Sequence, residues 1–195
     1  GTYIATSKKD LPDNRGKWAR FIGVGDGNSS NPIIVRGASS TSRPILSGPV
    51  GDYNGYTMRI FGDYWIVKDL VITEGSKGVV LDRSNNCELN NLLVHNIGDE
   101  GIHFRDGSSN NLAIKCEIRN TGVKQPNYGE GFYVGSDKGQ HTTDPNDTDY
   151  NPYCFNNTID DCIVGPNVAA EGVDVKEGTK NTIIRNCQFS ADGIS

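Results

Sequence analysis

Three glutamates recur at equivalent places in the sequence. Glu100, Glu130 and Glu171 each stand directly before a glycine that opens a short alternating segment. If these segments are neighbouring strands about 4.8 Å apart, the carboxylates lie one above another and repel, unless a cation or a basic group lies among them. Clustered oxygen ligands of this kind suit Ca²⁺. The alternative interpretation is a solvated corner of the fold, where the charges splay apart and are screened.

The same segments place further polar side chains on one face, because their apolar residues predict an inward face and the alternate residues then point outward. A cation next to an amine is what β-elimination of a uronate sugar requires. The metal offsets the sugar carboxylate and acidifies the C5 proton, which a Lys or Arg base removes. Each such residue alone can equally be an ordinary exterior residue of a strand. The outward residues are His103, Arg105, Tyr133, Asp174 and Lys176.

The recurrence of these charges on one face favours a binding or catalytic site there, with a polysaccharide as the partner and Ca²⁺ as the cofactor. The predicted site comprises the metal ligands Glu100, Glu130 and Glu171, the catalytic residues Lys176, Arg105 and His103, and the substrate-binding residues Tyr133, Lys138 and Asp174.

Four segments of the sequence, 86–94, 110–118, 156–164 and 181–189, share one pattern. Each opens with Asn, has Leu or Cys six residues later, and has an aliphatic residue or Phe two residues after that. A period of about two dozen residues is typical of solenoids, whose coils are stable only when stacked. The sequence therefore predicts an all-β solenoid, a parallel β-helix of about six to seven coils. A sandwich or barrel, the main competitor, does not explain matched residues at this spacing.

Stacked coils turn the repeated positions into columns. Small apolar residues make an internal column, in which cysteines act as packing residues, although neighbouring cysteines could also bridge. Asn suits a turn because it tolerates the left-handed conformation and its amide can bond the amides above and below. The internal column is Leu70, Leu92, Cys116, Cys162 and Cys187, and the asparagine column is Asn86, Asn110, Asn156 and Asn181.

The chain is predicted to be a single β-helix domain over residues 1–195. Segments 32–35, 44–46 and 56–60 are predicted to be less regular strands of earlier coils. Loop insertions near 121–130 and 139–155 are rich in turn residues and are expected to shape a binding face. The chain starts without Met and stops inside a further repeat, so we expect it to be a fragment of a longer β-helix.

The overall charge argues against two classes of partner. The formal net charge is -5 and the sequence pI is about 5.2, whereas nucleic acid and anionic membranes need a basic face. No apolar run approaches the roughly 20 residues of a membrane span. Sequons make Asn28 and Asn146 candidate N-glycan sites, whereas Asn156 lies in the asparagine column. These features favour a secreted, extracellular protein.

The pattern resembles the pectin-lyase-like superfamily of right-handed parallel β-helices. The resemblance covers nearly the whole chain, and segment 32–37 followed by 44–48 resembles the opening coil of such proteins. It implies a right-handed parallel β-helix. The fold hosts lyases, hydrolases, epimerases and adhesins, so it does not by itself imply one activity.

One coil is similar to the active-site coil of the chondroitinase B and alginate lyase family. The matching residues are Glu171 to Lys176, followed by Asn181, Thr182 and Ile183. The resemblance implies that Glu171 binds Ca²⁺ and that Lys176 is the base. The family's second Glu falls on Ala169 here, and its arginine acid falls about one coil later, where the chain ends.

Two functional hypotheses follow. The first is a secreted polysaccharide lyase that cleaves an acidic polysaccharide by Ca²⁺-assisted β-elimination. The second is a non-catalytic extracellular glycan-binding or structural β-helix, which could self-associate end to end because open solenoid ends are unpaired edges. A glycoside hydrolase is a third, since it needs carboxylates on adjacent outward positions.

Overall fold

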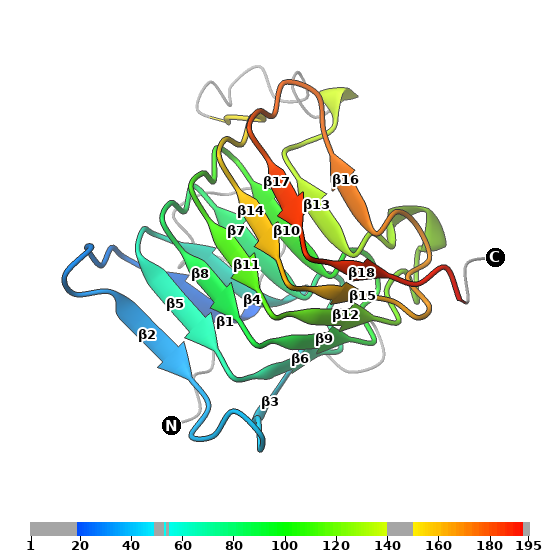
Figure 1. The fold of residues 1–195 in the computed structure, drawn as a ribbon, viewed down its shortest axis with the longest axis horizontal. Coiled ribbons are helices and arrows are strands. Elements are labelled where there is room, and N and C mark those ends of the chain that lie inside the picture. The colour runs from blue at the N-terminus through cyan, green and yellow to red at the C-terminus, as the bar shows by residue number, and fades with distance from the viewer. Residues whose placement is uncertain (1–18, 49–52, 54, 140–149, 193–195) are drawn as a thin grey trace.

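The computed structural model of the protein describes residues 19–48, 53, 55–139 and 150–192. Within them, three parallel sheets of six strands each wrap around one axis, and every coil contributes one strand to each sheet (Figure 1). The predicted all-β parallel β-helix is therefore confirmed. The predicted glycan site Asn146 and the central part of the predicted loop 139–155 lie outside the described residues.

Strands of successive coils pair in register within each sheet. The first sheet contains β1 (Ala19–Val24), β4 (Tyr56–Phe61), β7 (Val79–Asp82), β10 (Ile102–Arg105), β13 (Phe132–Val134) and β16 (Val173–Val175). The second contains β2 (Ile33–Arg36), β5 (Trp65–Lys68), β8 (Glu88–Asn90), β11 (Leu112–Ile114), β14 (Thr158–Asp160) and β17 (Ile183–Arg185). The third contains β3 (Ile45–Ser47), β6 (Val71–Thr73), β9 (Leu93–His95), β12 (Glu117–Arg119), β15 (Ile163–Val164) and β18 (Gln188–Phe189).

Apolar side chains from all three sheets fill the interior. In-register pairing places Ile102 between Val79 and Phe132, and all three are buried. The predicted internal column is confirmed, with Leu70, Leu92, Cys116 and Cys162 buried and Cys187 packed against them. All five cysteines lie in the described part of the chain and are free thiols.

Single residues in the left-handed conformation turn the chain from one sheet to the next. Asn110, Asn156 and Asn181 have φ of 59°, 56° and 57°. The amide of Asn156 donates to Asn110 Oδ1, and that of Asn181 to Asn156 Oδ1, each at 3.0 Å. This conformation costs most L residues about 1–2 kcal/mol, and Asn tolerates it better. The predicted ladder is confirmed over these coils, and a second one, not predicted, consists of Asn96, Asn120 and Asn167.

Glycines precede β10 and β13 because successive coils approach closely there. A Cβ on Gly101 would lie 2.7 Å from the carbonyl oxygen of Gly131, and one on Gly131 would lie 2.6 Å from that of Gly172. Both distances are shorter than real Cβ contacts, so only glycine fits without a shift of the backbone. The residue directly before each glycine is thereby held at the same height in its coil.

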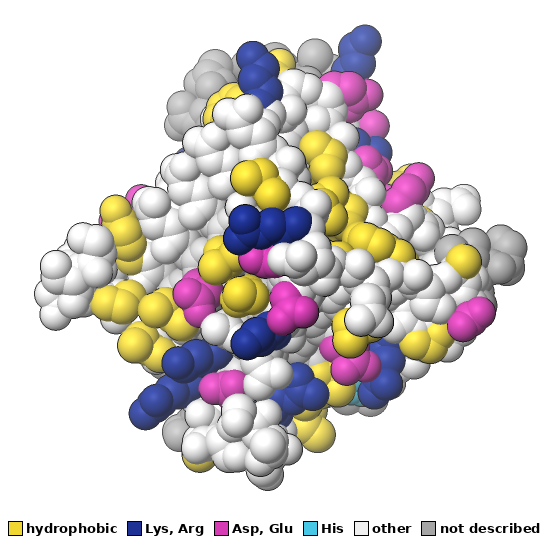
Figure 2. Space-filling model, viewed as in Figure 1, with side chains coloured by type: hydrophobic (Ala, Val, Ile, Leu, Met, Phe, Trp, Pro, Cys, Tyr) yellow, Lys and Arg dark blue, Asp and Glu magenta, His cyan; other side chains and the backbone are white. Residues whose placement is uncertain are grey.

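The outer surface mixes charges of both signs. Figure 2 shows Lys and Arg side chains next to Asp and Glu on the face drawn. No described segment forms a helix long and apolar enough to cross a membrane.

At the last coil, Ile184 and Phe189 are 42% and 53% exposed. Self-association through such an end stays a prediction.

Replacing Asn156 with Ala should destabilise the protein by about 1–3 kcal/mol, because Ala loses both ladder hydrogen bonds and is strained in this conformation. Asn156→Gly should cost less, since glycine adopts a φ of 56° freely. Urea unfolding of both variants measures the difference. Equal stability of the two variants would show that backbone strain at this turn does not contribute to the free energy of unfolding.

Candidate functional site

The outer face of the first sheet holds the predicted site residues. Register pairs His103 with Tyr133 and Tyr133 with Asp174, so these three lie in one column. Lys176 follows directly after β16, where its backbone N–H donates to Val134 O at 2.9 Å. The expectation that these are solvent-exposed exterior residues is wrong for two of them, because His103 is only 5% exposed and Tyr133 only 9%.

Two of the predicted loop regions cover this face. The 3-10 helix η2 (Pro126–Tyr128) brings Tyr128, and the segment after residue 149 brings Tyr150, to a cavity of about 420 Å³. His103 and Tyr133 line the same cavity. The hydroxyls of Tyr150 and Ser136 hydrogen-bond at its edge. The loops therefore add aromatic side chains to a polar pocket on the outward face of the strands, and this pocket remains open to solvent.

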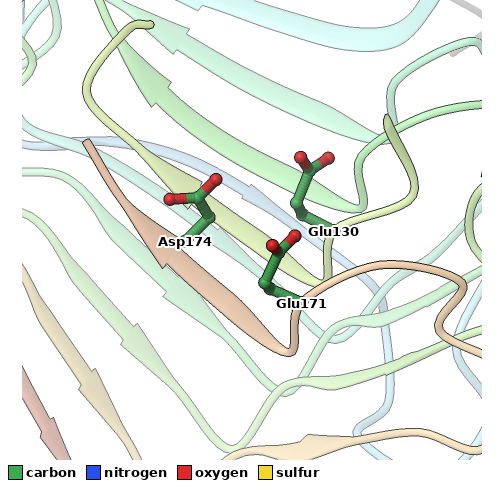
Figure 3. A group of neighbouring side chains, drawn as sticks. All are labelled: Glu130, Glu171 and Asp174. Carbon is green, nitrogen blue, oxygen red and sulfur yellow. The ribbon is translucent and has the colours of Figure 1, made fainter. Parts of the chain in front are cut away.

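The three predicted glutamates stack through their backbones, but their side chains separate into two groups. The glycine before β10 donates its N–H to Glu130 O, and the glycine before β13 to Glu171 O, each at 2.9 Å. Glu100 ion-pairs with Lys77. Glu130 and Glu171 instead join Asp174, and one oxygen from each of these three lies within 4.8 Å of the others (Figure 3).

Glu130 has the environment of a cation ligand. It is 4% exposed, and its Oε2 has no hydrogen-bond partner among the described residues. Burial raises the pKa of Glu130 to about 7, and the charges of Glu100 and Glu171 add to the increase. A buried carboxylate oxygen without a donor, next to two further carboxylates, fits an oxygen-ligated cation such as Ca²⁺.

The carboxylates that accompany Glu171 come from different positions than the family resemblance implies. Ala169, where that resemblance places a second Glu, packs against the backbone of loop 121–130 at Gly122 and Gly129. Glu130 supplies a carboxylate from the preceding coil instead, and Asp174 supplies one from within β16. The cluster therefore spans two coils.

Lys176 lies between the acidic cluster and Tyr133. Its Nζ is 2.6 Å from Asp174 Oδ2 and 5.0 Å from the centre of the Tyr133 ring. Burial lowers the pKa of Lys176, but the hydrogen bond to Asp174 and the neighbouring Tyr133 outweigh it and raise that pKa above its usual value. Lys176 is thus held as an ammonium while Asp174 is its partner.

Arg105 is fixed by a buried carboxylate. Its Nε and Nη2 lie 2.6 and 2.7 Å from the two oxygens of Asp82, and its Nη1 lies 3.2 Å from the Tyr56 hydroxyl. Arg59 reaches the same carboxylate at 2.5 Å. Burial alone would raise the pKa of Asp82, but Arg105 and Arg59 hold it well below its usual range. Arg105 is therefore held in a fixed position in the lining of the cavity.

His103 forms a second polar group with Glu100 and Lys77. Its Nε2 lies 2.9 Å from the carbonyl oxygen of Gly135, and its Nδ1 lies 3.6 Å from Glu100 Oε1. Burial, followed by the Lys77 ammonium, lowers the pKa of His103 to about 3. The ring is therefore neutral. Its proton is on Nε2, because a carbonyl oxygen can only accept, and Nδ1 carries a lone pair.

Sequence reasoning misses several residues of this site. Lys77 carried a signal, since it stands before a glycine as Glu100 does in the next coil. Asp82 carried one too, since it is the equivalent of Arg105 one coil earlier, whereas Tyr150 carried none, because it lies in a loop without a repeat. Lys138, predicted to bind substrate, is exposed beside Asp137 at the edge of the cavity.

The family of the chain follows from comparison with known proteins. The model of the right handed beta helix region matches residues 56–194. The chain belongs to this right-handed β-helix family. The predicted pectin-lyase-like superfamily is thereby confirmed, as is the predicted fold. No curated protein gives a significant match.

Two solved structures share this β-helix. The alginate lyase from Paenibacillus sp. str. FPU-7 is 41% identical, with a TM-score of 0.83 over 92% of this chain and 57% of that one. Pectate lyase Pel9A is 20% identical, with a TM-score of 0.71 over 95% of this chain and 44% of that one, a likeness in fold alone. The chain thus spans a little over half of the alginate lyase.

Calcium should bind at Glu130, Glu171 and Asp174, as measured by isothermal titration calorimetry. Glu130→Gln keeps the shape of the side chain but removes its charge, and it should weaken binding by about tenfold or more. Glu117→Gln, which removes the charge of a half-buried pair with Arg119 in β12, should bind as the wild type does. Equal affinity of the two variants would place the ion elsewhere.

The protein should lose stability in acid through His103. Its folded pKa of about 3 lies below the unfolded value of 6.5, so between these values only the unfolded chain takes up the proton. This contribution is fully present above the unfolded pKa and falls by about 1.4 kcal/mol per pH unit as the pH decreases. His103→Phe, which keeps a ring against Tyr133, should show a shallower fall in urea unfolding. Parallel pH curves would contradict a buried neutral histidine.

Proposed function

We propose that this chain is the β-helix of a polysaccharide lyase that cleaves a uronate polysaccharide by Ca²⁺-assisted β-elimination. The observation that carries the proposal is the Lys176 amine, 2.6 Å from Asp174 and next to the Glu130 and Glu171 carboxylates. An amine beside a cation-binding cluster is the set of groups that this reaction needs. The 41% identity to an alginate lyase supports the same function and makes alginate the first substrate to test.

Lys176 would accept the C5 proton of the uronate. Its side chain is 22% exposed, so a sugar can reach the amine. Asp174 belongs both to the carboxylate cluster and to the ion pair with Lys176. The protonation state of Lys176 therefore depends on whether Asp174 contacts the lysine or a cation in the cluster. When Asp174 turns to the cluster, Lys176 loses the partner that favours its ammonium form.

The carboxylates that would hold the cation are preorganised by the backbone. Glu130 and Glu171 precede strands that pair in register, and Asp174 lies opposite Tyr133 in that pairing. Bound among these three, Ca²⁺ would offset the charge of the uronate carboxylate and make its C5 proton more acidic.

Tyr133 would position the sugar beside Lys176. Its ring packs edge-on against His103, with 4.4 Å between the ring centroids, and lies under the lysine amine. Burial raises the pKa of Tyr133, although Lys176 opposes this, so the phenol stays protonated and can donate to a sugar oxygen. Arg105 and His103 would shape the wall of the site, and exposed Lys138 would contact the polyanion at its edge.

A polysaccharide substrate favours a site of action outside the cell, and we propose that the protein is secreted. Among the described residues, Asn28 remains the candidate glycan site, because it is exposed. The amide of Asn156 is instead engaged in the asparagine ladder.

Lys176→Ala should reduce turnover by about 10²–10⁴-fold, because the reaction loses its proton acceptor. The measurement is the ultraviolet absorbance of the unsaturated uronate product, with alginate, pectate, chondroitin and glucuronan, in Ca²⁺ or chelator. Lys180→Ala, which removes an exposed lysine four residues further along, is the matched control and should keep full activity.

Two results would count against this assignment. Undiminished turnover in folded Lys176→Ala protein would remove Lys176 from the mechanism. Absence of product from every polymer, with folded wild-type protein, would favour the non-catalytic glycan-binding hypothesis.

A further inference from the structure

Three cysteines stack in consecutive coils, at the turn between the second and third sheets. The backbone N–H of Ile163 donates to Cys116 O, and that of Gln188 donates to Cys162 O, each at 2.9 Å. The strands that follow them, β12, β15 and β18, pair in register. Cys116, Cys162 and Cys187 therefore occupy the same position of three successive coils. The proposed elimination uses none of them.

Packing alone does not require sulfur at this position. The two preceding coils place Leu70 and Leu92 in the same column, and both leucines are buried in the core. A cysteine buries less apolar surface than a leucine, so three coils in succession give up part of the hydrophobic stabilisation that the column offers. Thiol chemistry is a reason for three adjacent cysteines that packing does not supply.

The three thiols share one orientation. Each Sγ lies close to the carbonyl oxygen two residues earlier in its own coil, at 3.5 Å for Cys116, 3.2 Å for Cys162 and 3.1 Å for Cys187. Because the side chains point the same way from in-register positions, the sulfurs follow one another along the axis of the β-helix. This arrangement also suits thiol–disulfide exchange, in which one sulfur attacks the next along the line of the bond that breaks.

The spacing of the column permits a disulfide between neighbouring coils only. In-register strands are about 4.8 Å apart, within the range of about 4.4–6.8 Å for the Cα atoms of a disulfide. Residues two coils apart are separated by about 9.6 Å, beyond the limit of about 7 Å. Cys162 can therefore bridge to either neighbour, whereas Cys116 cannot bridge to Cys187.

Solvent access selects one of the two pairs. Cys116 and Cys162 are 1% and 0% exposed, whereas Cys187 is only half-buried. The neighbours of Cys187 in the last coil, Ile184 and Phe189, are 42% and 53% exposed. A small reagent can therefore reach the sulfur of Cys187 and not the other two.

We propose that Cys162 and Cys187 form a disulfide site that links the last two described coils. Glu130 precedes the first strand of the coil that holds Cys162, and Glu171 precedes that of the coil that holds Cys187. The bridge thus joins the two coils that share the carboxylate cluster. The inference does not depend on lyase activity, because it concerns the attachment of one coil to the next.

The bridge forms by exchange with a small disulfide such as oxidised glutathione. The Cys187 sulfur attacks this reagent, forms a mixed disulfide and releases one glutathione. The Cys162 sulfur then attacks Cys187, and the second glutathione leaves toward solvent. The two thiols lose two protons and two electrons, and oxidised glutathione is reduced to two molecules of glutathione.

Deprotonation of the thiols limits the rate of this exchange. Burial raises the pKa of Cys187, and the hydrogen bond with Cys116, followed by burial, raises the pKa of Cys162. The thiolate is the attacking form, so the exchange is slow at neutral pH and faster in mild alkali.

The first test treats the full chain with oxidised glutathione in mild alkali and maps its disulfides by peptide mass spectrometry. We expect the loss of two of the five thiols and a peptide that links Cys162 to Cys187, both reversed by dithiothreitol. Five free thiols after treatment, a glutathione retained on Cys187 in place of the bridge, or a different pairing would each overturn the proposal. This measurement needs no variant, so it does not depend on how well a variant folds.

Two matched variants separate the roles of the thiols. Cys116→Ala keeps both proposed partners and should form the bridge as the wild type does. Cys162→Ala leaves thiols two coils apart, so the reaction should stop at the mixed disulfide on Cys187. A bridge between Cys116 and Cys187 in the folded Cys162→Ala protein, or its absence from the folded Cys116→Ala protein, contradicts the assignment.

The bridge should also stabilise the protein. Because it closes a loop in the unfolded chain, the melting temperature of the wild type should rise by about 5 °C or more after treatment. Cys162→Ala protein, treated in the same way, should show no such rise. An unchanged melting temperature of the bridged wild type would mean that the disulfide does not hold the two coils together, and would overturn the proposal.

Discussion

The close approach of successive coils is the constraint on which the rest of the structure depends. At Gly101 and Gly131 there is no room for a Cβ, and the N–H of each donates to the glutamate carbonyl of the next coil. These contacts fix the pairing register of neighbouring coils to within one residue. A slip by one residue would exchange the inner and outer faces of the strands. The hydrophobic core and the polar outer face are therefore set by the same contacts.

This register forces like charges together. Glu100, Glu130 and Glu171 follow one another coil by coil, at a spacing where carboxylates repel. The structure relieves the repulsion in two ways. Glu100 turns to the Lys77 ammonium, while Glu130 and Glu171 converge with Asp174 on a point suited to a cation. The candidate catalytic chemistry thus arises where the repeat itself creates an electrostatic conflict.

The loops reduce the access of water to part of the outer face. Tyr128 and Tyr150 line a pocket over strands that would otherwise face open water. Burial makes His103 a neutral acceptor, although the alternation predicts that it points outward, and burial also raises the pKa of Glu130. The β-helix supplies the spacing of the polar groups, and the loops supply their desolvation. Hydrogen bonds and ion pairs are stronger in such a site than in open solvent.

The sequence by itself determined the solenoid, because its signals are local and repeated. Asn156 marks a left-handed turn, each glycine marks a close approach of coils, and alternation places His103, Tyr133 and Asp174 in one column. Only the tertiary structure decided which of these groups act together. The separation of Glu100 from Glu130, the capture of Arg105 by Asp82 and the burial of His103 depend on partners from other coils and from loops without a repeat. Periodicity specifies the face on which a side chain lies, whereas its partner and its exposure depend on atoms that are distant in sequence.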